Sequence, residues 1–458
     1  MIKNYGDLVR SGHSAPDRRA RRLCLAALEA ALNAVDPYRC VRSNLSIARG
    51  RILAGNRSIS ISRVSGIRVL AVGKASLRMA RAALSALEPL LIGGIVLAPK
   101  GKHCRTIDGR FEVHFTGHPF PDSAGLRASQ RVMDEITKMA RDELLLCLIS
   151  GGASALLPLP AEGIRLADEI AITEQLVKSG ASIHEINTVR RHISELKGGR
   201  LVELCPASIV LSLLISDVPG NQLHDIGSGL TAEDPTTFRD AVDVLRGYGI
   251  WRAAPSRVRS HLLNGIRGLA RETPKPGKLR GRNLHNVVIA DNRTACKAAN
   301  QTLSEAGISS EIFTTSAEMD ASDMGSFLAT ASDQMTTRHK TGKGRAVIAG
   351  GETTVRVHGR GKGGRNQETV LSAVERIAGL NGVVVAAMGT DGVDGNSNAA
   401  GAIIDGNTFF RAKRKGLVID DYIRRNDSNG FFRAIKDCLI TGPTGTNVGD
   451  IYLALSVV

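Results

Sequence analysis

The chain has 458 residues, which is too long for one ordinary hydrophobic core, so we expect two or three domains. Its 43% apolar and 23% charged residues are typical of globular proteins and exclude wholesale disorder. Lys and Arg number 60 against 44 Asp and Glu, and this net charge of +16 suits nucleic acid or, equally, small anionic substrates. Aromatic residues make up only 3% of the chain, which disfavours single-stranded nucleic-acid binding through base stacking.

The cysteines and the apolar segments indicate the compartment. The seven cysteines are scattered and form no CxxC pair: Cys24, Cys40, Cys104, Cys147, Cys205, Cys296 and Cys438. Neither disulfides nor a structural zinc site is expected, and a reducing cytoplasm fits. No N-terminal segment resembles a signal peptide, and no apolar run approaches the roughly 18 residues of a membrane span. We therefore expect a cytoplasmic protein with no membrane partner.

The first half of the chain predicts alternating helices and strands. A helix with its arginines outward is expected at 17–35. The expected strands are 67–72, 94–98, 111–115, 144–149 and 209–215. Further helices are expected at 75–87, 123–139, 166–179 and 182–197. Continuous apolar strands between helices indicate a parallel sheet with helices on both faces.

Polar turns follow three of these strands directly. They are Gly73-Lys74, Ser150-Gly151-Gly152 and Ser216-Asp217. In an open parallel sheet, ligands bind outside the carboxyl ends of the strands, so the three turns predict a ligand site. The segment Ser150–Ser154 lacks the GxSxG pattern of a nucleophile, and an anion-binding turn at a helix start is the better supported interpretation.

The second half of the chain begins after a segment with little periodicity. Residues 252–282 hold nine Lys or Arg and a single acid, in Pro- and Gly-rich sequence. We predict domains at 17–250 and 285–458, joined by a basic linker at 251–284. In the second domain, strands are expected at 286–290, 308–313, 345–348, 353–357, 383–387, 437–440 and 451–457. Its expected helices are 293–306, one that ends near Met335, and one that ends near Ile377.

A glycine-rich basic loop follows the expected strand 353–357. It reads GRGKGGRNQE from Gly359 to Glu368. Glycines let a backbone approach a ligand closely and the cations suit an anion, so a phosphate loop and a solvated hairpin loop are both open interpretations. The loop also matches GxGxxG, but a dinucleotide fingerprint needs an acid about 20 residues later. The nearest strand-end acid, Asp391, lies 27 residues beyond Gly364, which disfavours a nicotinamide site.

Other residues in glycine-rich turns suit metal or base chemistry. Asp217, Asp391 and Asp394 each follow an expected strand, where an aspartate commonly forms the turn itself. Beside phosphate loops, such acids also suit Mg²⁺ binding or general-base work. The eleven histidines show neither HxH nor HExxH spacing, so a catalytic zinc is not expected.

Taken together, these stretches resemble the glycerate 2-kinase family, whose C-terminal part is called the MOFRL domain and whose members are also labelled hydroxypyruvate reductases. The matching stretches follow the family's order from about residue 20 to the end: AVGKAS (71–76), GHPFPDSAG (117–125), LISGGASALLPLPAEGI (148–164), INTVRRHISELKGGRL (186–201), LLISDVPGN (213–221), DPTTF (234–238), GGETTVRVHGRGKGGRNQE (350–368), GTDGVDGNSNAAGAIID (389–405), NDS (426–428) and TGPTGTNVGD (441–450). The resemblance implies a Rossmann-like N-terminal α/β domain and a C-terminal α/β domain containing the MOFRL region (about 345–455), with the active site in the cleft between them. It also implies ATP-dependent phosphorylation of D-glycerate to 2-phosphoglycerate, with Mg²⁺.

The resemblance places the family's essential lysine and arginine on Lys74 and Arg365. We expect both to neutralise the transferring phosphoryl group and Asp217 to orient or deprotonate the 2-hydroxyl of glycerate. Asp391 is the candidate Mg²⁺ ligand. The residues expected to bind nucleotide or substrate are Ser150, Gly151, Gly152, Ser154, Asn187, Arg191, Arg200, Glu352 and Asn366, of which Arg191 or Arg200 would hold the substrate carboxylate.

The sequence departs from the family pattern at four places: Ala153, Asn221-Gln222, Leu230 and Asn429. The loop 221–230 is altered most, which bears on the substrate. Two alternative functions stay open, an NAD(P)H-dependent reductase acting on hydroxypyruvate and, outside enzymes, a basic nucleic-acid-binding protein motivated by the net charge. The phosphoglycerate isomer and the oligomeric state, a homodimer being one option, also stay open.

Overall fold

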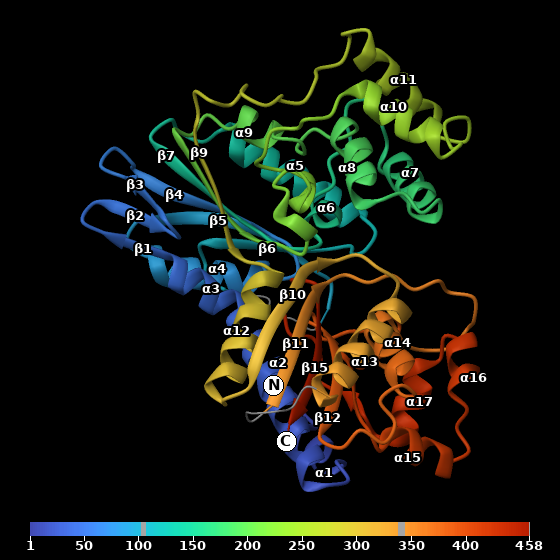
Figure 1. Ribbon diagram of the computed structural model, residues 1–458. Helices are drawn as coiled ribbons and strands as arrows, with labels where there is room; N and C mark the ends of the chain where they lie inside the picture. Colours follow the sequence, from blue (N-terminus) through green and yellow to red (C-terminus); the bar gives the residue numbers. More distant parts are fainter. Residues whose placement is uncertain (102–106, 338–343, 458) are drawn as a thin grey trace. The chain divides into compact units, whose positions relative to one another are not determined.

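The structure is a computed structural model that describes residues 1–101, 107–337 and 344–457 (Figure 1). The chain divides into two compact units. The middle unit is Pro37–Ile289, and the terminal unit combines Met1–Asp36 with Ala290–Val458. This division differs from the predicted boundaries, because the N-terminal helix packs on the C-terminal half and not on the strands that follow it.

The middle unit is built on a sheet with the strand order β6-β5-β4-β7-β8-β9. Its strands are β4 (Gly66–Val72), β5 (Leu91–Pro99), β6 (Phe111–Thr116), β7 (Glu143–Ile149), β8 (Ile209–Ile215) and β9 (Asn283–Ala290). Strands β4 to β8 all pair in parallel, so their carboxyl ends share one edge. Every residue of β7 and β8 is buried, which explains their continuous apolar sequences.

Helices cover both faces of this sheet, as predicted (Figure 1). Helices α5 (Ser123–Thr137), α6 (Ala153–Leu156) and α9 (Arg200–Leu204) share a core with Leu70 and Leu145 on one face. Helix α4 (Ser76–Leu87) contacts β4, β5 and β7. Against α4 lie α3 (Pro37–Asn44) and the first strand of a small antiparallel sheet of β1 (Leu45–Ala48), β2 (Arg51–Ala54) and β3 (Arg57–Ser60). The sequence pattern did not predict this small sheet.

A group of helices in the middle unit has its own apolar core, which includes Val189 and Phe238. Its helices are α7 (Leu166–Lys178), α8 (Ile183–His192), α10 (Phe238–Gly247) and α11 (Ser256–Ile266). Helix α11 lies inside the segment predicted as a basic linker and buries Val258 and Leu262. That segment is therefore part of the packed middle unit. Two short 3₁₀ helices, η1 (Pro219–Asn221) and η2 (Ile226–Ser228), lie in the loop after β8.

The terminal unit contains a mixed sheet with the order β10-β11-β15-β12-β13-β14. Its strands are β10 (Ser309–Ala317), β11 (Gly344–Gly351), β12 (Val383–Gly389), β13 (Gly401–Asp405), β14 (Cys438–Leu439) and β15 (Asp450–Val457). Strands β10 and β11 are parallel, and the other neighbours are antiparallel. Strand β13 was not predicted.

Two layers of helices pack on this sheet. Helices α2 (Ala15–Ala34) and α12 (Asn292–Glu305) contact each other and the sheet, and α2 begins at a capping box formed by Ser14 and Asp17. A second core joins the sheet to α13 (Ala321–Thr337), α14 (Arg365–Ala373), α15 (Thr408–Arg414), α16 (Ile419–Arg424) and α17 (Ser428–Ile435). Helix α1 (Tyr5–Arg10) packs on α2.

Three local predictions were wrong. Residues 353–357 form no strand, because β11 already pairs with β10 and β15 and the chain leaves the sheet after Gly351. Helix α8 ends at His192 and does not reach 197. Arg21 on α2 is fully buried and not outward-facing, because two buried carboxylates bind it.

The described cysteines are buried free thiols; Cys104 lies outside the described residues. Among the described residues, the helices are too short or too polar to cross a membrane.

Candidate active site

Lys74 lies in the turn between β4 and α4, beside the turn that follows β7. The backbone N–H of Lys74 donates to the carbonyl oxygen of Gly151 at 2.9 Å, and the N–H of Ala75 donates to Ser150 Oγ at 3.0 Å. Gly73 has a φ of 127°, and a Cβ there would lie 2.1 Å from Ser150 Oγ, so only glycine allows this approach. The structure thus brings Lys74, Ser150 and Gly151 together at the carboxyl edge of the sheet.

Gly152 and His118 lie beside these residues, and we call the group of Lys74, Ser150, Gly151, Gly152 and His118 the Lys74 corner. A Cβ on Gly152 would lie 2.9 Å from His118 Nε2 and 3.6 Å from Lys74 Cγ, so both side chains flank this glycine. The helix that follows, α6, has only four residues, and the N–H of Ala153 donates to the Ser150 carbonyl at 3.3 Å. Because a helix of one turn has little dipole, the positive charge of this corner comes from Lys74. His118 was not among the residues predicted to bind a ligand.

Asp217 belongs to the same edge of the sheet. It follows β8, which pairs in parallel with β7, so it lies at the carboxyl end of the strand next to Ser150. The three strand-end turns that the sequence singled out therefore share one edge, as predicted from the parallel order.

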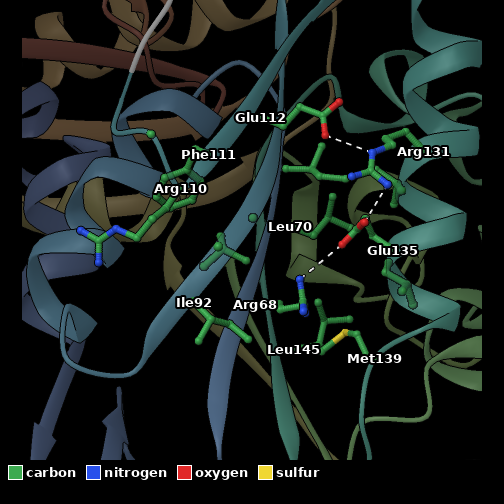
Figure 2. A pocket seen from close by; sticks show the side chains of 17 residues that line it. Arg68, Leu70, Ile92, Arg110, Phe111, Glu112, Arg131, Glu135, Met139 and Leu145 are labelled. Carbon is green, nitrogen blue, oxygen red and sulfur yellow. Dashed lines mark hydrogen bonds and ion pairs between the residues drawn. The ribbon is translucent and has the colours of Figure 1, made fainter.

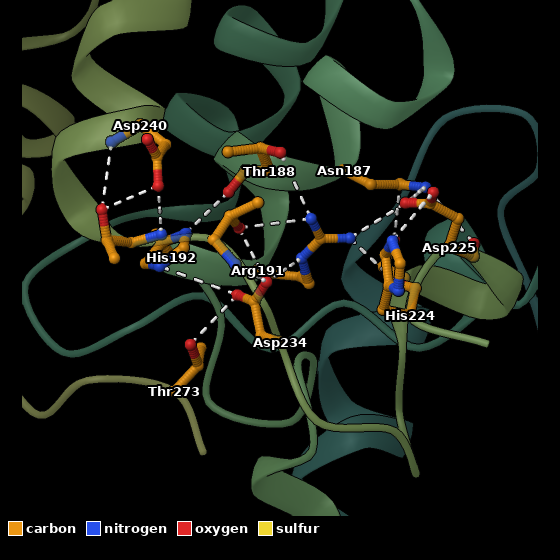
Figure 3. A network of polar contacts seen from close by, with 12 residues as sticks. Asn187, Thr188, Arg191, His192, His224, Asp225, Asp234, Asp240 and Thr273 are labelled. Carbon is orange, nitrogen blue, oxygen red and sulfur yellow. Dashed lines mark hydrogen bonds and ion pairs between the residues drawn. The ribbon is translucent and has the colours of Figure 1, made fainter. Parts of the chain in front are cut away.

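A chain of hydrogen bonds links Ser154 to Asp225. Ser154 Oγ lies 2.7 Å from Ser228 Oγ, and Ser228 donates to Asn187 Oδ1 at 2.9 Å. Asn187 Nδ2 in turn donates to Asp225 Oδ1 at 3.2 Å. Figure 3 shows Asn187 and Asp225 in this network. The structure therefore places two predicted binding residues, Ser154 and Asn187, in one network.

Arg191 is buried inside the same network and neutralised by the protein's own acids (Figure 3). Its Nη1 donates to Asp225 Oδ1 at 2.9 Å, and its Nε lies 2.9 Å from Asp234 Oδ1. Burial acts to raise the pKa of Asp225, but hydrogen bonding with His184 and the charge of Arg191 lower it below its usual range. With two buried carboxylates as partners, Arg191 is placed to hold this region together.

Arg200 is not brought into this network. It is buried and donates through Nη1 to the Ser194 carbonyl at 3.0 Å and through Nη2 to the Arg271 carbonyl at 2.8 Å. Burial lowers the pKa of Arg200. Its contacts are those of a structural arginine that fixes backbone carbonyls.

Arg365, in the terminal unit, is the first residue of α14 and lies between two carboxylates. Its Nε is 2.5 Å from Asp450 Oδ2, and its Nη1 is 2.5 Å from Glu352 Oε1. Burial alone would lower the pKa of Arg365, but the charges of Asp450 and Glu352 raise it above its usual value. The side chains of Arg365 and Glu352 remain 33% and 44% exposed, so this centre is open to solvent on one side.

Asn366 and Gln367 bind the buried carboxylate of Asp394, one of the three aspartates whose glycine-rich turns suggested metal or base chemistry. Asp394 accepts hydrogen bonds from the backbone N–H groups of Asn366 at 3.0 Å and Gln367 at 2.8 Å, at the start of α14. Burial raises the pKa of Asp394 to about 6, although these hydrogen bonds act to lower it. The predicted binding residue Asn366 thus anchors the helix start next to Arg365.

The glycines of the loop 359–364 are needed for packing against the protein itself. A Cβ on Gly359 would lie 2.1 Å from the Arg425 carbonyl oxygen, and one on Gly361 would lie 2.5 Å from Asp427 Cβ. The N–H groups of His358, Gly359, Gly361, Lys362 and Gly363 all donate to internal acceptors. The loop therefore serves to position Arg365, and these N–H groups do not cradle a phosphate.

Asp391 lies in the turn after β12. Its Oδ1 accepts a hydrogen bond from the N–H of Val393 at 3.1 Å, and its side chain is only partly buried. This is the turn-forming geometry expected of an aspartate in such a loop, and a carboxylate is the type of ligand that a hard cation takes.

A cavity of about 320 Å³ lies at the opposite, amino-terminal edge of the middle-unit sheet (Figure 2). Its lining includes Leu70 and Leu145, with Arg68, Arg110 and Arg131 around it. Each of these arginines forms an ion pair with a neighbouring acid. Because Lys74 lies beyond the other ends of the same strands, this cavity is separate from the candidate site.

An α/β protein whose charged side chains sit on glycine turns at the carboxyl ends of parallel strands is of the class that binds small anionic molecules. Comparison with known proteins makes this specific. The profile of a domain of unknown function (DUF4147) matches residues 23–263, and that of the MOFRL family matches residues 345–450. The chain is 38% identical over 437 residues to glycerate 2-kinase from Pyrococcus horikoshii, which covers 95% of this chain and 97% of that protein.

Structural similarity agrees with the sequence similarity. A crystal structure of glycerate kinase from Thermotoga maritima matches with a TM-score of 0.82 at 37% identity, covering 95% of this chain and 99% of that one. A protein of Agrobacterium vitis that bears only a provisional name, hydroxypyruvate reductase, is 34% identical over 96% of this chain and 95% of its own length. The chain belongs to the glycerate 2-kinase family.

Proposed function

We propose that this protein is an ATP-dependent glycerate 2-kinase that converts D-glycerate to 2-phosphoglycerate. The observation that carries the proposal is the corner formed by Lys74 and the Ser150–Gly152 turn, at the edge of a parallel sheet where anionic ligands bind. Family membership supplies the substrate class, since relatives that match this chain over nearly its full length are named glycerate 2-kinases.

The chemistry assigned to the residues is phosphoryl transfer by positioning and charge. The 2-hydroxyl oxygen of glycerate forms a bond to the γ-phosphorus, the bond from that phosphorus to the leaving oxygen of ADP breaks, and the hydroxyl proton passes to Asp217. Lys74 and Arg365 offset the negative charge on the transferring group. The backbone of Gly151 and Gly152 orients the anion beside Lys74.

Mg²⁺ would accompany the nucleotide, and the residues present fit it. Mg²⁺ binds oxygen ligands, usually one or two carboxylates together with substrate phosphates. Asp391 supplies a partly exposed carboxylate, and Glu352 and Asp450 give the surroundings of Arg365 an excess of negative charge. That excess suits a metal–nucleotide complex better than a bare phosphate, and the ion would supply further charge neutralisation.

The remaining predicted residues divide into two groups. Ser154, Asn187, Glu352 and Asn366 keep their proposed binding roles, with Asn366 acting through the start of α14. Arg191 and Arg200 are proposed as positioning residues, because both are buried and already bonded to protein groups. The substrate carboxylate would then be bound by another group, because both of these arginines already bind protein atoms.

A direct assay tests the proposal. Purified protein supplied with ATP, Mg²⁺ and D-glycerate should form phosphoglycerate, and the isomer identified by coupled enzymes or NMR should be the 2-phosphate. Lys74→Ala should lower turnover about 10²–10³-fold, whereas Lys138→Ala, at an exposed lysine on the far end of α5, should not. Loss of NADH absorbance with hydroxypyruvate, without phosphoglycerate formation, would instead establish the reductase.

A further inference from the structure

We propose that His184, His224 and Asp225 form a binding site for a divalent transition-metal ion. One ligand atom from each residue lies within 4.8 Å of the other two. His184 Nδ1 is 2.9 Å from Asp225 Oδ2, and His224 Nε2 is 3.5 Å from the same oxygen. Two ring nitrogens and one carboxylate oxygen therefore converge on one point.

The carboxylate of Asp225 is held in the orientation that a metal ligand needs. Its Oδ1 accepts hydrogen bonds from Arg191 Nη1 at 2.9 Å and Asn187 Nδ2 at 3.2 Å, and only its Oδ2 is turned to the two imidazoles (Figure 3). Asp225 is 5% exposed and Arg191 is fully buried, so this support is rigid. Hydrogen bonds of this kind orient ligating carboxylates in metal sites.

The two histidines leave the point accessible from solvent. The side chain of His184 is 52% exposed and that of His224 20%, and their rings lie 5.5 Å apart in an edge-to-face arrangement. An ion could therefore enter without opening the core. With metal–ligand bonds of about 2.0–2.2 Å, the ligand atoms of one ion lie roughly 3 Å from each other, so the two distances to Asp225 Oδ2 already fit. The two ring nitrogens lie within 4.8 Å of each other, and the exposed His184 side chain on the first turn of α8 can bring them closer.

The donor set selects the class of ion. Imidazole nitrogens suit Zn²⁺, Co²⁺, Ni²⁺ or Fe²⁺, whereas Mg²⁺ takes oxygen ligands and keeps its waters. Two histidines and one carboxylate are also the protein ligands of open zinc sites, in which a further position stays free for water or another ligand. The site is thus separate from the Mg²⁺ proposed to accompany the nucleotide.

Metal binding would fix the loop after β8 to α8. His224 and Asp225 belong to the loop 221–230, where the sequence departs from the family pattern, and His184 belongs to α8. The same loop carries Ser228, which bonds to Asn187, so an ion would hold the network that includes Ser154 and Asn187. No spacing motif reveals this site, because His184 and His224 lie 40 residues apart.

Metal titration of the tag-free full-length protein, after chelator treatment, tests the proposal. We expect one equivalent of Co²⁺ to bind with a visible absorption band, and Zn²⁺ to displace it and raise the thermal unfolding midpoint. His184→Ala and His224→Ala should each weaken Co²⁺ affinity at least tenfold. Asn187→Ala, which removes one of the groups that orient Asp225, should weaken it about 10–100-fold.

The control is His13→Ala, an exposed histidine outside the cluster, which should leave Co²⁺ binding unchanged. Thermal unfolding in the presence of chelator must show that the variants are folded, and His184→Ala is the most secure of them because its side chain is half exposed. If the wild-type protein binds Co²⁺ no better than the His184→Ala, His224→Ala double variant, the cluster is only an ion pair and the proposal is wrong. Because no glycerate or ATP is present, this result does not depend on the proposed function.

Discussion

Two arginines of the terminal unit each lie between two carboxylates, but only one of them is open to solvent. Arg21, on α2, has its Nε 2.6 Å from Asp405 and its Nη1 3.1 Å from Asp437, and all three side chains are fully buried. Arg365 binds Asp450 and Glu352 and remains one-third exposed. The same set of residue types thus occurs once sealed inside the protein and once at its surface.

The charge balance of the two centres differs as well. Asp437 also pairs with Arg411, so the sealed centre sets two arginines against two aspartates. Around Arg365, Asp450 and Glu352 are joined by the nearby buried Asp394, whose pKa is raised to about 6. A balanced buried centre holds a fold together, whereas an open centre with unbalanced charge and a perturbed pKa is typical of a ligand site.

The largest expected effect is a loss of stability when Arg21 of the sealed centre is replaced. Arg21→Met should lower the free energy of unfolding by about 3–5 kcal/mol, because it leaves Asp405 buried without its counter-charge. Urea unfolding measures this loss. Arg22→Met, the exposed neighbour on the same helix, is the matched control and should cost well under about 1 kcal/mol. A loss below about 1 kcal/mol for Arg21→Met would remove the distinction between the two centres.

Replacing Arg365 in the open centre should instead lower the rate of catalysis. Arg365→Ala is expected to lower kcat about 10²–10³-fold, equivalent to about 3–4 kcal/mol, through lost stabilisation of the transferring phosphoryl group. Its stability should fall by less than that of Arg21→Met, because Glu352 stays hydrated and Tyr452 still donates to Asp450 at 3.1 Å. Arg360→Ala, at an exposed arginine of the same loop, should keep near wild-type turnover. Equal losses of kcat in Arg365→Ala and Arg360→Ala would show that Arg365 has no specific role in phosphoryl transfer.

The contrast between these centres also shows what could be predicted from the sequence. Strands β7 and β8 were predicted because burial on both faces requires a continuous apolar run. The parallel order then predicted that Lys74, Ser150 and Asp217 share one edge. Arg365 was predicted from its motif. The role of the glycines before it was not predicted, because they pack against Arg425 and Asp427, which lie more than 60 residues further along the chain.

Buried polar contacts between distant segments were beyond sequence reasoning. The periodic pattern predicted Arg21 on a solvated helix face, but Asp405 and Asp437, about 400 residues later in the chain, bind it inside the protein. The same holds for Asp225, which binds both His184 and Arg191 from another element. A periodic pattern reports which face of a helix is apolar, but it carries no information about a charge whose partner comes from another part of the chain.

Asp394 gives the open centre a pH dependence that runs opposite to that of a paired carboxylate. Its pKa is about 6 in the folded protein, against roughly 3.9 when unfolded, so its contribution to stability is complete below pH ~3.9 and is lost as the pH rises through 6. Relative to an Asp394→Asn variant, the wild-type protein should lose about 2 kcal/mol between pH 4 and pH 7. Urea unfolding of both proteins at a series of pH values measures this loss. If the wild-type protein instead kept or gained stability relative to the variant as the pH rises, Asp394 would be ionised and well solvated.

The smallest loss of stability is expected when the charge of Glu352 is removed. Comparing this variant with its counterpart in the sealed centre tests the difference between the two centres most directly. Glu352→Gln and Asp405→Asn each remove one of the two carboxylates that bind an arginine. Glu352 is 44% exposed, so its loss should change the unfolding free energy by less than about 1 kcal/mol, with at most a few-fold change in the KM for ATP. Asp405 is fully buried, and its loss should cost about 3 kcal/mol or more, because Arg21 keeps its charge in the core with one partner fewer. Urea unfolding of the two variants side by side measures the two losses of unfolding free energy. Equal costs would mean that Arg365 is held as tightly as Arg21 and is not available to a ligand.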